Sequence, residues 1–160
     1  WVQRPESIGH IRAKSADPFE APAIQPNYFS HETDRRLSIA GMKLARDLMQ
    51  TPEFSPHVEC EELPGKDVHT EDEMLAYYRQ NATTTFHLMG TCRMGPDSDP
   101  TAVVDDQLRV RGIEGLRVAD ASIMPTMPSA NTNAATIMIG EKCADFIKGR
   151  HLESVNLAGK

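Results

Sequence analysis

"NTNAATIMIGEKCADFIKG", residues 131–149, is a stretch rich in apolar residues near the end of the chain. Its apolar residues recur at helical spacing and predict one helix that ends at Gly149. They lie on nearly every side of that helix: Ala134, Ala135, Ile137, Met138, Ile139, Ala144, Phe146 and Ile147. A helix that is apolar nearly all round is buried on most sides. Because the chain has only 160 residues, we expect a partner surface that the chain itself does not supply.

The first fifty residues predict a strand, an extended crossing and a helix. "SIGHIRAKS", residues 7–15, alternates in the way that is typical of a short strand, and the proline-rich stretch 15–30 predicts an extended, turn-rich crossing. Apolar residues at helical spacing then predict a helix over 32–50, with Ser30 as its N-terminal cap.

A second helix is predicted over 71–80. The helix opens at "TEDE", residues 70–73, in which Thr70 is the predicted cap and Glu73 lies at the capping-box position. The three acidic residues of this motif fall in the first turn. The helix macrodipole favours acidic residues at this end.

The second half of the chain predicts strands. "TTTFHLMGT", residues 83–91, is β-branched and then apolar, and predicts a buried strand that ends at Gly90. Two short strands follow, around Leu108–Val110 and Leu116–Ala119, joined by a hairpin-like turn that contains two glycines.

Composition excludes several classes of protein. The formal charge of −6 leaves no basic stripe for nucleic acid, and no apolar run reaches the roughly 18 residues of a membrane span. The chain begins at Trp1 without a signal-peptide pattern, so we interpret its start as cut. Three dispersed cysteines indicate reduced thiols and a cytoplasmic location, although the full-length protein could be membrane-peripheral. His57 and Cys60 have the spacing of one metal-ligand pair but lack a second pair, so we predict no metal site.

His87 is the first candidate for chemistry, in "FHLMGTCRMG", residues 86–95. Two interpretations are open. A histidine among apolar residues can be a core residue satisfied by a backbone carbonyl, or it can be a proton acceptor at a strand end. The glycine and threonine that follow favour a ligand, because backbone can approach a ligand closely at Gly90.

Two further clusters lie downstream. Asn131, Thr132 and Asn133 open the predicted last helix, where unpaired N–H groups attract negative charge, although one Asn is also a common cap. Asp120 follows a predicted strand and could hold a ligand hydroxyl or cap the next turn. No GxGxxG occurs, so the chain lacks the usual cradle for a dinucleotide phosphate.

These motifs resemble the C-terminal portion of the glucose–methanol–choline (GMC) oxidoreductases, which are FAD-dependent alcohol oxidases and dehydrogenases. The resemblance rests on "FHLMGTCRMG", "VVDDQLRVRGIEGLRVADASIMP" and "SANTNAATIMIGE" in that order, preceded by "RPESIGHIRAKSADPFEAPAIQPNYFSHETDRR". It covers nearly the whole chain, and the choline and alcohol dehydrogenase branch is the most similar.

The resemblance implies an α+β fold. Residues 1–85 would be a substrate-binding part with a portion of an antiparallel sheet. Residues 86–150 would hold the active-site motif and the closing strand and helix elements of an FAD-binding domain, and residues 151–160 would be a disordered tail.

The resemblance also implies the roles of site residues. His87 would take the alcohol proton while hydride goes to flavin N5, with Asn131 as the second catalytic residue. Thr132 and Asn133 would lie beside the flavin, and Asp120 with Ala121 would contact its ribityl–pyrophosphate stretch.

Alternatives within this resemblance are a hydroxynitrile lyase and a non-catalytic binding module. The implied partners are an alcohol and the N-terminal FAD-binding portion, which this chain lacks; without it we expect no activity, and exposed apolar surface could drive self-association. One departure is Leu88, where the family usually has proline, and this puts the shape of the substrate pocket in question.

Overall fold

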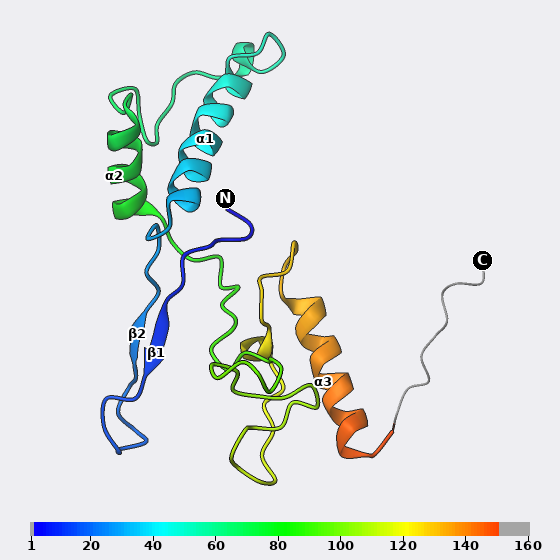
Figure 1. Ribbon diagram of the computed structural model, residues 1–160. Helices are drawn as coiled ribbons and strands as arrows, with labels where there is room; N and C mark the ends of the chain where they lie inside the picture. The colour runs from blue at the N-terminus through cyan, green and yellow to red at the C-terminus, as the bar shows by residue number, and fades with distance from the viewer. Residues whose placement is uncertain (1, 151–160) are drawn as a thin grey trace, which may run out of the picture. The chain divides into compact units, whose positions relative to one another are not determined.

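The computed structural model describes residues 2–150, which form an α+β arrangement of helices and one small antiparallel sheet (Figure 1). The elements are β1 (His10–Arg12), β2 (Ala23–Gln25), α1 (Glu32–Met49), the 3-10 helix η1 (Ser55–His57), α2 (Glu71–Asn81), the 3-10 helix η2 (Ala121–Ile123) and α3 (Asn133–Ile147). The chain divides into two compact units at the Thr85–Phe86 junction. The assignment of these units to substrate-binding and FAD-binding parts stays a prediction. The predicted disordered tail, 151–160, lies outside the described residues.

The first unit opens with the antiparallel pair β1–β2, in which Ile11 lies opposite Ile24 (Figure 1). The strand predicted within residues 7–15 is confirmed. Its partner β2 lies in the stretch predicted only as an extended crossing, so the sequence analysis missed the pairing. The two segments approach closely at Gly9, where a Cβ atom would come within 2.7 Å of the Pro26 carbonyl oxygen.

The N-terminal cap of α1 is one residue later than predicted. His31 is the N-cap, because its Nδ1 accepts a hydrogen bond from the Thr33 backbone N–H at 3.3 Å; the assignment of Ser30 was wrong. Inside the first turn the buried Asp34 carboxylate accepts the backbone N–H groups of Glu6 and Ser7 at 2.9 and 2.8 Å. This carboxylate ties the N-terminal segment to the helix.

α2 packs beside α1 and begins at the predicted capping box. Thr70 Oγ1 accepts the Glu73 backbone N–H, and the Glu73 carboxylate accepts the Thr70 backbone N–H. Met42 of α1 and Met74 of α2 are the buried apolar side chains of the two helices. The Tyr78 hydroxyl donates to the Ser38 carbonyl at 3.1 Å, which adds a polar contact between the helices.

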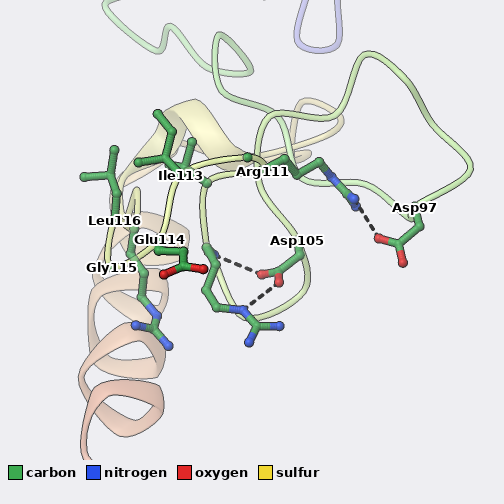
Figure 2. Close-up of a pocket in the computed structure, with 11 residues that line it drawn as sticks. Asp97, Asp105, Arg111, Ile113, Glu114, Gly115 and Leu116 are labelled. Atoms are coloured by element: carbon green, nitrogen blue, oxygen red, sulfur yellow. Dashed lines mark hydrogen bonds and ion pairs between the residues drawn. The ribbon is translucent and has the colours of Figure 1, made fainter.

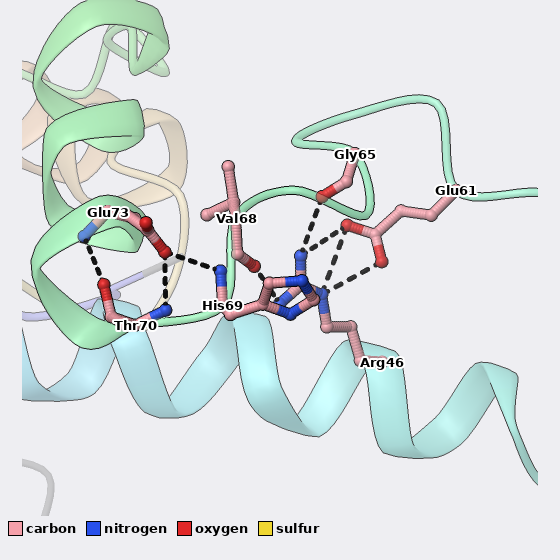
Figure 3. A network of polar contacts seen from close by, with 7 residues as sticks. All are labelled: Arg46, Glu61, Gly65, Val68, His69, Thr70 and Glu73. Carbon is pink, nitrogen blue, oxygen red and sulfur yellow. Dashed lines mark hydrogen bonds and ion pairs between the residues drawn. The ribbon is translucent and has the colours of Figure 1, made fainter.

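Arg46 fixes the loop between the two helices (Figure 3). Its guanidinium donates to both Glu61 carboxylate oxygens, at 2.9 and 2.7 Å, and to the Val68 and Gly65 carbonyls, at 2.7 and 3.3 Å. One side chain of α1 therefore holds residues 61–68 against the helix.

The second unit has its own core. Its buried residues come from the 104–110 segment, from η2 and the residue after it, and from α3: Val104, Leu108, Ile123, Met124, Ile139 and Cys143. Ile139 and Cys143 are four residues apart on α3 and so face the same side of the helix. The helix contributes one buried stripe to this core.

The predicted hairpin is present as a short antiparallel pairing. The Val110 N–H donates to the Leu116 carbonyl at 3.0 Å, and the Val118 N–H donates to the Leu108 carbonyl at 3.1 Å. The pairing consists of isolated bridges rather than two full strands, and the connecting turn contains two glycines at positive φ.

The buried strand predicted over 83–91 is wrong. This stretch is irregular, Phe86 has a φ of 62°, and the side chains of Phe86 and Leu88 are 84% and 65% exposed. Apolar, β-branched composition predicted burial, but the described residues leave these two side chains largely uncovered.

α3 starts at Asn133, two residues later than predicted, and Gly149 follows its end at a φ of 67°. Within this chain only Ile139 and Cys143 of the helix are buried, whereas Ile137, Met138 and Ile147 are more than half exposed. Burial on most sides is therefore not achieved by the described residues alone. Among residues 2–150, no helix is both long enough and apolar enough to span a membrane.

Candidate active site

Two of the predicted motifs lie side by side in the second unit. The backbone N–H groups of Gly90, Cys92 and Met94 donate to the carbonyls of Ala121, Ser122 and Ile123, at 3.3, 2.9 and 2.8 Å respectively. Alternate residues of the stretch after His87 are thus bonded to successive residues of η2. This ladder positions the histidine segment against the segment that begins at Asp120.

Gly90 makes that approach feasible. Its φ is 84°, a conformation that costs little for glycine and much for residues with a side chain. A Cβ atom at this position would also lie 3.4 Å from the Met124 carbonyl oxygen. The close approach that the structure describes at Gly90 is to the η2 segment of the same chain, and the predicted approach of a ligand stays a prediction.

His87 contacts the third motif through a side-chain pair. Its Nδ1 lies 3.1 Å from Thr132 Oγ1, within hydrogen-bonding distance, although the two residues are 45 positions apart in sequence. His87 is partly buried and Thr132 is 7% exposed. The alternative interpretation of His87, a core histidine satisfied by a backbone carbonyl, does not describe this contact, because the partner is a hydroxyl.

The start of α3 is not closed by a side-chain cap. Thr132 occupies the N-cap position but makes no capping hydrogen bond, and no acidic residue lies in the first turn. The first N–H groups of a helix have no intrahelical partner and carry a partial positive charge. Asn131 and Asn133, on either side of Thr132, are exposed. This helix end therefore retains donors for a ligand.

Asp120 has a structural role. It is the N-cap of η2, and its carboxylate accepts the Ser122 backbone N–H at 2.7 Å. The capping interpretation of Asp120 therefore describes its contact, while Asp120 remains exposed and Ala121 is half-buried. The contact of both residues with a cofactor stays a prediction.

Two hollows in the described part of the chain are lined by other residues. One of about 480 Å³ lies at the 109–117 hairpin, where Arg109 pairs with Asp105 at 2.7 Å and Arg111 with Asp97 at 2.6 Å (Figure 2). Burial alone would raise the pKa of Asp105, but hydrogen bonds from Arg109 and from the Gln107 backbone hold it below its ordinary value. A second hollow, of about 770 Å³, lies in the first unit between α1, residues 58–64 and the end of α2.

The site is consequently an open surface in the second unit. It combines an imidazole held at Nδ1, a helix N-terminus without a side-chain cap, and two exposed amides. Phe86 and Leu88, on either side of His87, add exposed apolar surface. A group with a planar apolar face and a polar edge would match this combination.

Sequence reasoning missed one feature of this site. It placed Thr132 beside a cofactor, which stays a prediction, and it did not foresee that the side chain of Thr132 contacts His87. Helical spacing gives no information on a contact between residues 87 and 132. The one sequence signal that could have indicated a further contact is the threonine between two asparagines. A simple helix cap does not need three polar residues.

A family model described as GMC oxidoreductase matches residues 5–140, which is most of the chain. The chain is 48% identical over 147 residues to human mitochondrial choline dehydrogenase, and these residues are 92% of this chain and 25% of that protein. It is 47% identical over 143 residues to the alcohol dehydrogenase [acceptor] of Pseudomonas putida, covering 89% of this chain and 26% of that protein. The chain thus spans about a quarter of the length of these relatives.

Solved structures agree with this assignment. Pyridoxine 4-oxidase from Mesorbium loti superimposes with a TM-score of 0.83 at 32% identity, over 94% of this chain and 29% of that one. An Aspergillus oryzae formate oxidase variant, studied for its FAD modification, superimposes with a TM-score of 0.80 at 35% identity, over 89% and 25%. By sequence and by fold, the chain belongs to the GMC oxidoreductase family.

Proposed function

We propose that this chain is the C-terminal part of an FAD-dependent dehydrogenase or oxidase that acts on the CH–OH group of choline or another alcohol. The observation that carries the proposal is the pairing of His87 with Thr132 at the uncapped start of α3, inside the family-matched residues. A histidine beside a helix end that favours negative charge supports a proposed base next to the oxygen that develops this charge.

The relatives support the substrate class. Choline dehydrogenase and alcohol dehydrogenase [acceptor] each match this chain at nearly half identity. The chain covers about a quarter of each, so we propose that polypeptide N-terminal to it supplies most of the FAD site. This division agrees with the lack of a GxGxxG cradle in the chain.

The residues present fit part of a flavin. Uncapped N–H groups at the start of α3 and the exposed amides of Asn131 and Asn133 would hold the polar pyrimidine edge. Asp120 and Ala121 would lie along the ribityl–pyrophosphate stretch. When bound, FAD accepts the hydride that the alcohol carbon loses.

The chain's own residues would accept the alcohol proton and stabilise the negative charge that develops on the alcohol oxygen. His87 accepts the alcohol O–H proton on the ring nitrogen that Thr132 does not contact, Nε2. Asn131 donates its side-chain N–H to the oxygen as negative charge develops there. The positive end of α3 stabilises the same charge. His87 and Asn131 are the proposed catalytic residues.

The test is anaerobic mixing of the flavin-loaded protein that contains this chain with choline and with simple primary alcohols. Bleaching of the flavin absorbance supports oxidation of the CH–OH group. Cleavage of a hydroxynitrile without bleaching would identify a lyase instead, and a protein that purifies without flavin and binds none would identify a binding module. The chain alone should reduce no electron acceptor.

A further inference from the structure

We propose that Thr132 is a positioning residue that selects the protonation tautomer of His87. Its hydroxyl oxygen accepts the hydrogen of His87 Nδ1, which leaves Nε2 unprotonated and able to accept a proton. The inference rests on the proposed function, because it concerns how His87 serves as the base.

The hydroxyl of Thr132 is placed for this task. At an N-cap, Thr ordinarily accepts the N–H of the second or third helical residue, and this gives the side chain its usual structural value. Thr132 makes no such bond. Its oxygen lies instead 3.1 Å from His87 Nδ1, and the residue is 7% exposed, so solvent competes little for the contact.

The backbone keeps Thr132 in this place independently of the hydroxyl. The Thr132 carbonyl accepts the Thr136 backbone N–H at 2.9 Å and the Thr136 hydroxyl at 2.8 Å. The Thr132 side chain is therefore presented by the first turn of α3. His87 in turn lies three residues before Gly90, where the ladder to η2 begins. Thr132 is thus held by bonds of its own helix, and His87 lies close in sequence to a segment held by backbone bonds in the same unit.

The direction of the hydrogen bond decides the chemistry. Neutral imidazole carries one N–H, on either Nδ1 or Nε2. If the Thr132 hydroxyl donated to Nδ1, the imidazole hydrogen would be on Nε2 and His87 could not take a proton there. If Nδ1–H donates to Thr132 Oγ1, Nε2 keeps its lone pair. Only the second arrangement is compatible with His87 as a base. In general, the hydrogen-bond partner at one ring nitrogen determines whether the other nitrogen carries a hydrogen.

The test compares matched variants of the full-length, flavin-loaded protein. Thr132→Val keeps the β-branched shape and removes the acceptor, and should slow flavin reduction roughly 10- to 100-fold. The concentration of alcohol that gives half the maximal rate should stay nearly unchanged, because Thr132 does not touch the substrate. Thr132→Ser restores the oxygen and should recover most of the rate. Thr51→Val, in the first unit, is the control for removing a threonine hydroxyl that takes no part in holding His87 or Thr132, because that hydroxyl donates to the Leu48 carbonyl.

A second readout does not depend on turnover. Nitrogen-15 NMR of labelled histidine side chains reports which ring nitrogen carries the hydrogen. His87 is assigned as the histidine signal that disappears in His87→Gln. In the unmodified protein we expect hydrogen on Nδ1, and in Thr132→Val a shift towards hydrogen on Nε2. Thr51→Val should leave the tautomer as it is.

The outcomes separate the two proposals. A protein in which His87→Gln still reduces its flavin at the normal rate would remove the proposed function. A large loss in His87→Gln, together with an unchanged tautomer and rate in Thr132→Val, would keep the function and overturn the role of Thr132. Hydrogen on Nε2 in the unmodified protein would overturn it as well.

Discussion

His87 Nδ1 and Thr132 Oγ1 lie 3.1 Å apart and join two sequence motifs separated by 45 residues. The contact connects the segment that runs along η2 with the start of α3. The Thr132 side chain makes this contact and no helix cap. The polar residues at the two motifs are consequently parts of one site in the second unit.

Replacement of Asn131 should impair the chemical step. Asn131→Ala removes an exposed amide at the positive end of α3, so the developing negative charge loses a donor. Loss of one such donor costs roughly 100- to 1,000-fold in rate. Stopped-flow flavin reduction by alcohol measures the effect. Asn81→Ala, at the far end of α2 in the first unit, serves as the control and should reduce flavin normally. Equal rates in both variants would contradict the role of Asn131.

Gly90→Ala should destabilise the second unit. The residue has a φ of 84°, and its Cβ would meet the Met124 carbonyl oxygen at 3.4 Å. A side chain in the left-handed region costs about 1–2 kcal/mol. Chemical denaturation measures the free energy of unfolding.

Gly140→Ala is the matched control for that substitution. Gly140 lies within α3, and among the described residues no atom outside the helix's own backbone comes within 4 Å of where an alanine Cβ would stand. Alanine should therefore stabilise the helix by about 0.8–1 kcal/mol. The two Gly→Ala changes should shift stability in opposite directions. A Gly90→Ala protein as stable as the parent would show that the positive φ is not required.

The sequence predicts local structure well where local chemistry determines it. The capping box at Thr70 and Glu73 is visible in four letters and is confirmed, because both of its hydrogen bonds lie within one turn. The helix over 32–50 is also confirmed within one residue at its end, although its cap is His31. A histidine cap has no strong sequence signal, because Ser, Thr, Asp and Asn are the common capping residues.

The sequence fails where structure depends on distant residues. Residues 83–91 look like a buried strand because of their composition, yet burial requires a covering layer, and the described residues leave Phe86 and Leu88 mostly exposed. β2 and the contact between His87 and Thr132 likewise depend on partners far along the chain. The family resemblance selected His87 as a catalytic residue, and its role as a base stays a prediction.

Asp34→Asn should loosen the N-terminal segment from α1. Burial alone would raise the pKa of Asp34, but hydrogen bonds from Ser7 and from the Glu6 backbone outweigh it, so the pKa lies below its ordinary value. The amide variant turns one acceptor into a donor against a backbone N–H, at a cost of about 1–3 kcal/mol. Hydrogen exchange at the Glu6 and Ser7 amides should accelerate.

The same carboxylate gives a pH dependence with a definite sign. Because the folded-state pKa of Asp34 is lowered, its contribution is fully present above the unfolded-state value of about 3.9 and is lost as the pH falls through the folded-state pKa. The parent should lose stability on acidification through that range more steeply than Asp34→Asn. Identical pH dependence in the two proteins would contradict this account of Asp34.

Arg46→Met should release the loop between α1 and α2. The variant leaves Glu61 without its partner and removes donors from the Gly65 and Val68 carbonyls (Figure 3). Hydrogen bonding with Arg46 is the main reason that the pKa of Glu61 is lowered. Since these side chains are partly exposed, we expect a loss of about 1–2 kcal/mol in the free energy of unfolding.

Lys43→Met is the matched control for that loss. The Lys43–Glu71 pair joins the same two helices, but both side chains are about half exposed or more. Such pairs contribute about 0–1 kcal/mol. Urea denaturation should therefore show that Arg46→Met is clearly less stable than Lys43→Met. The reverse order would show that the loop contacts of Arg46 do not contribute to the free energy of unfolding.

The most direct measurement of the central claim is the rate of anaerobic flavin reduction by alcohol in His87→Gln, compared with the parent protein at equal flavin content. Glutamine keeps polar atoms near Thr132 but cannot accept the alcohol proton. The account predicts a rate lower by roughly 100- to 10,000-fold, as expected for loss of a general base. A flavin-loaded His87→Gln protein that is reduced at the parent rate would contradict it.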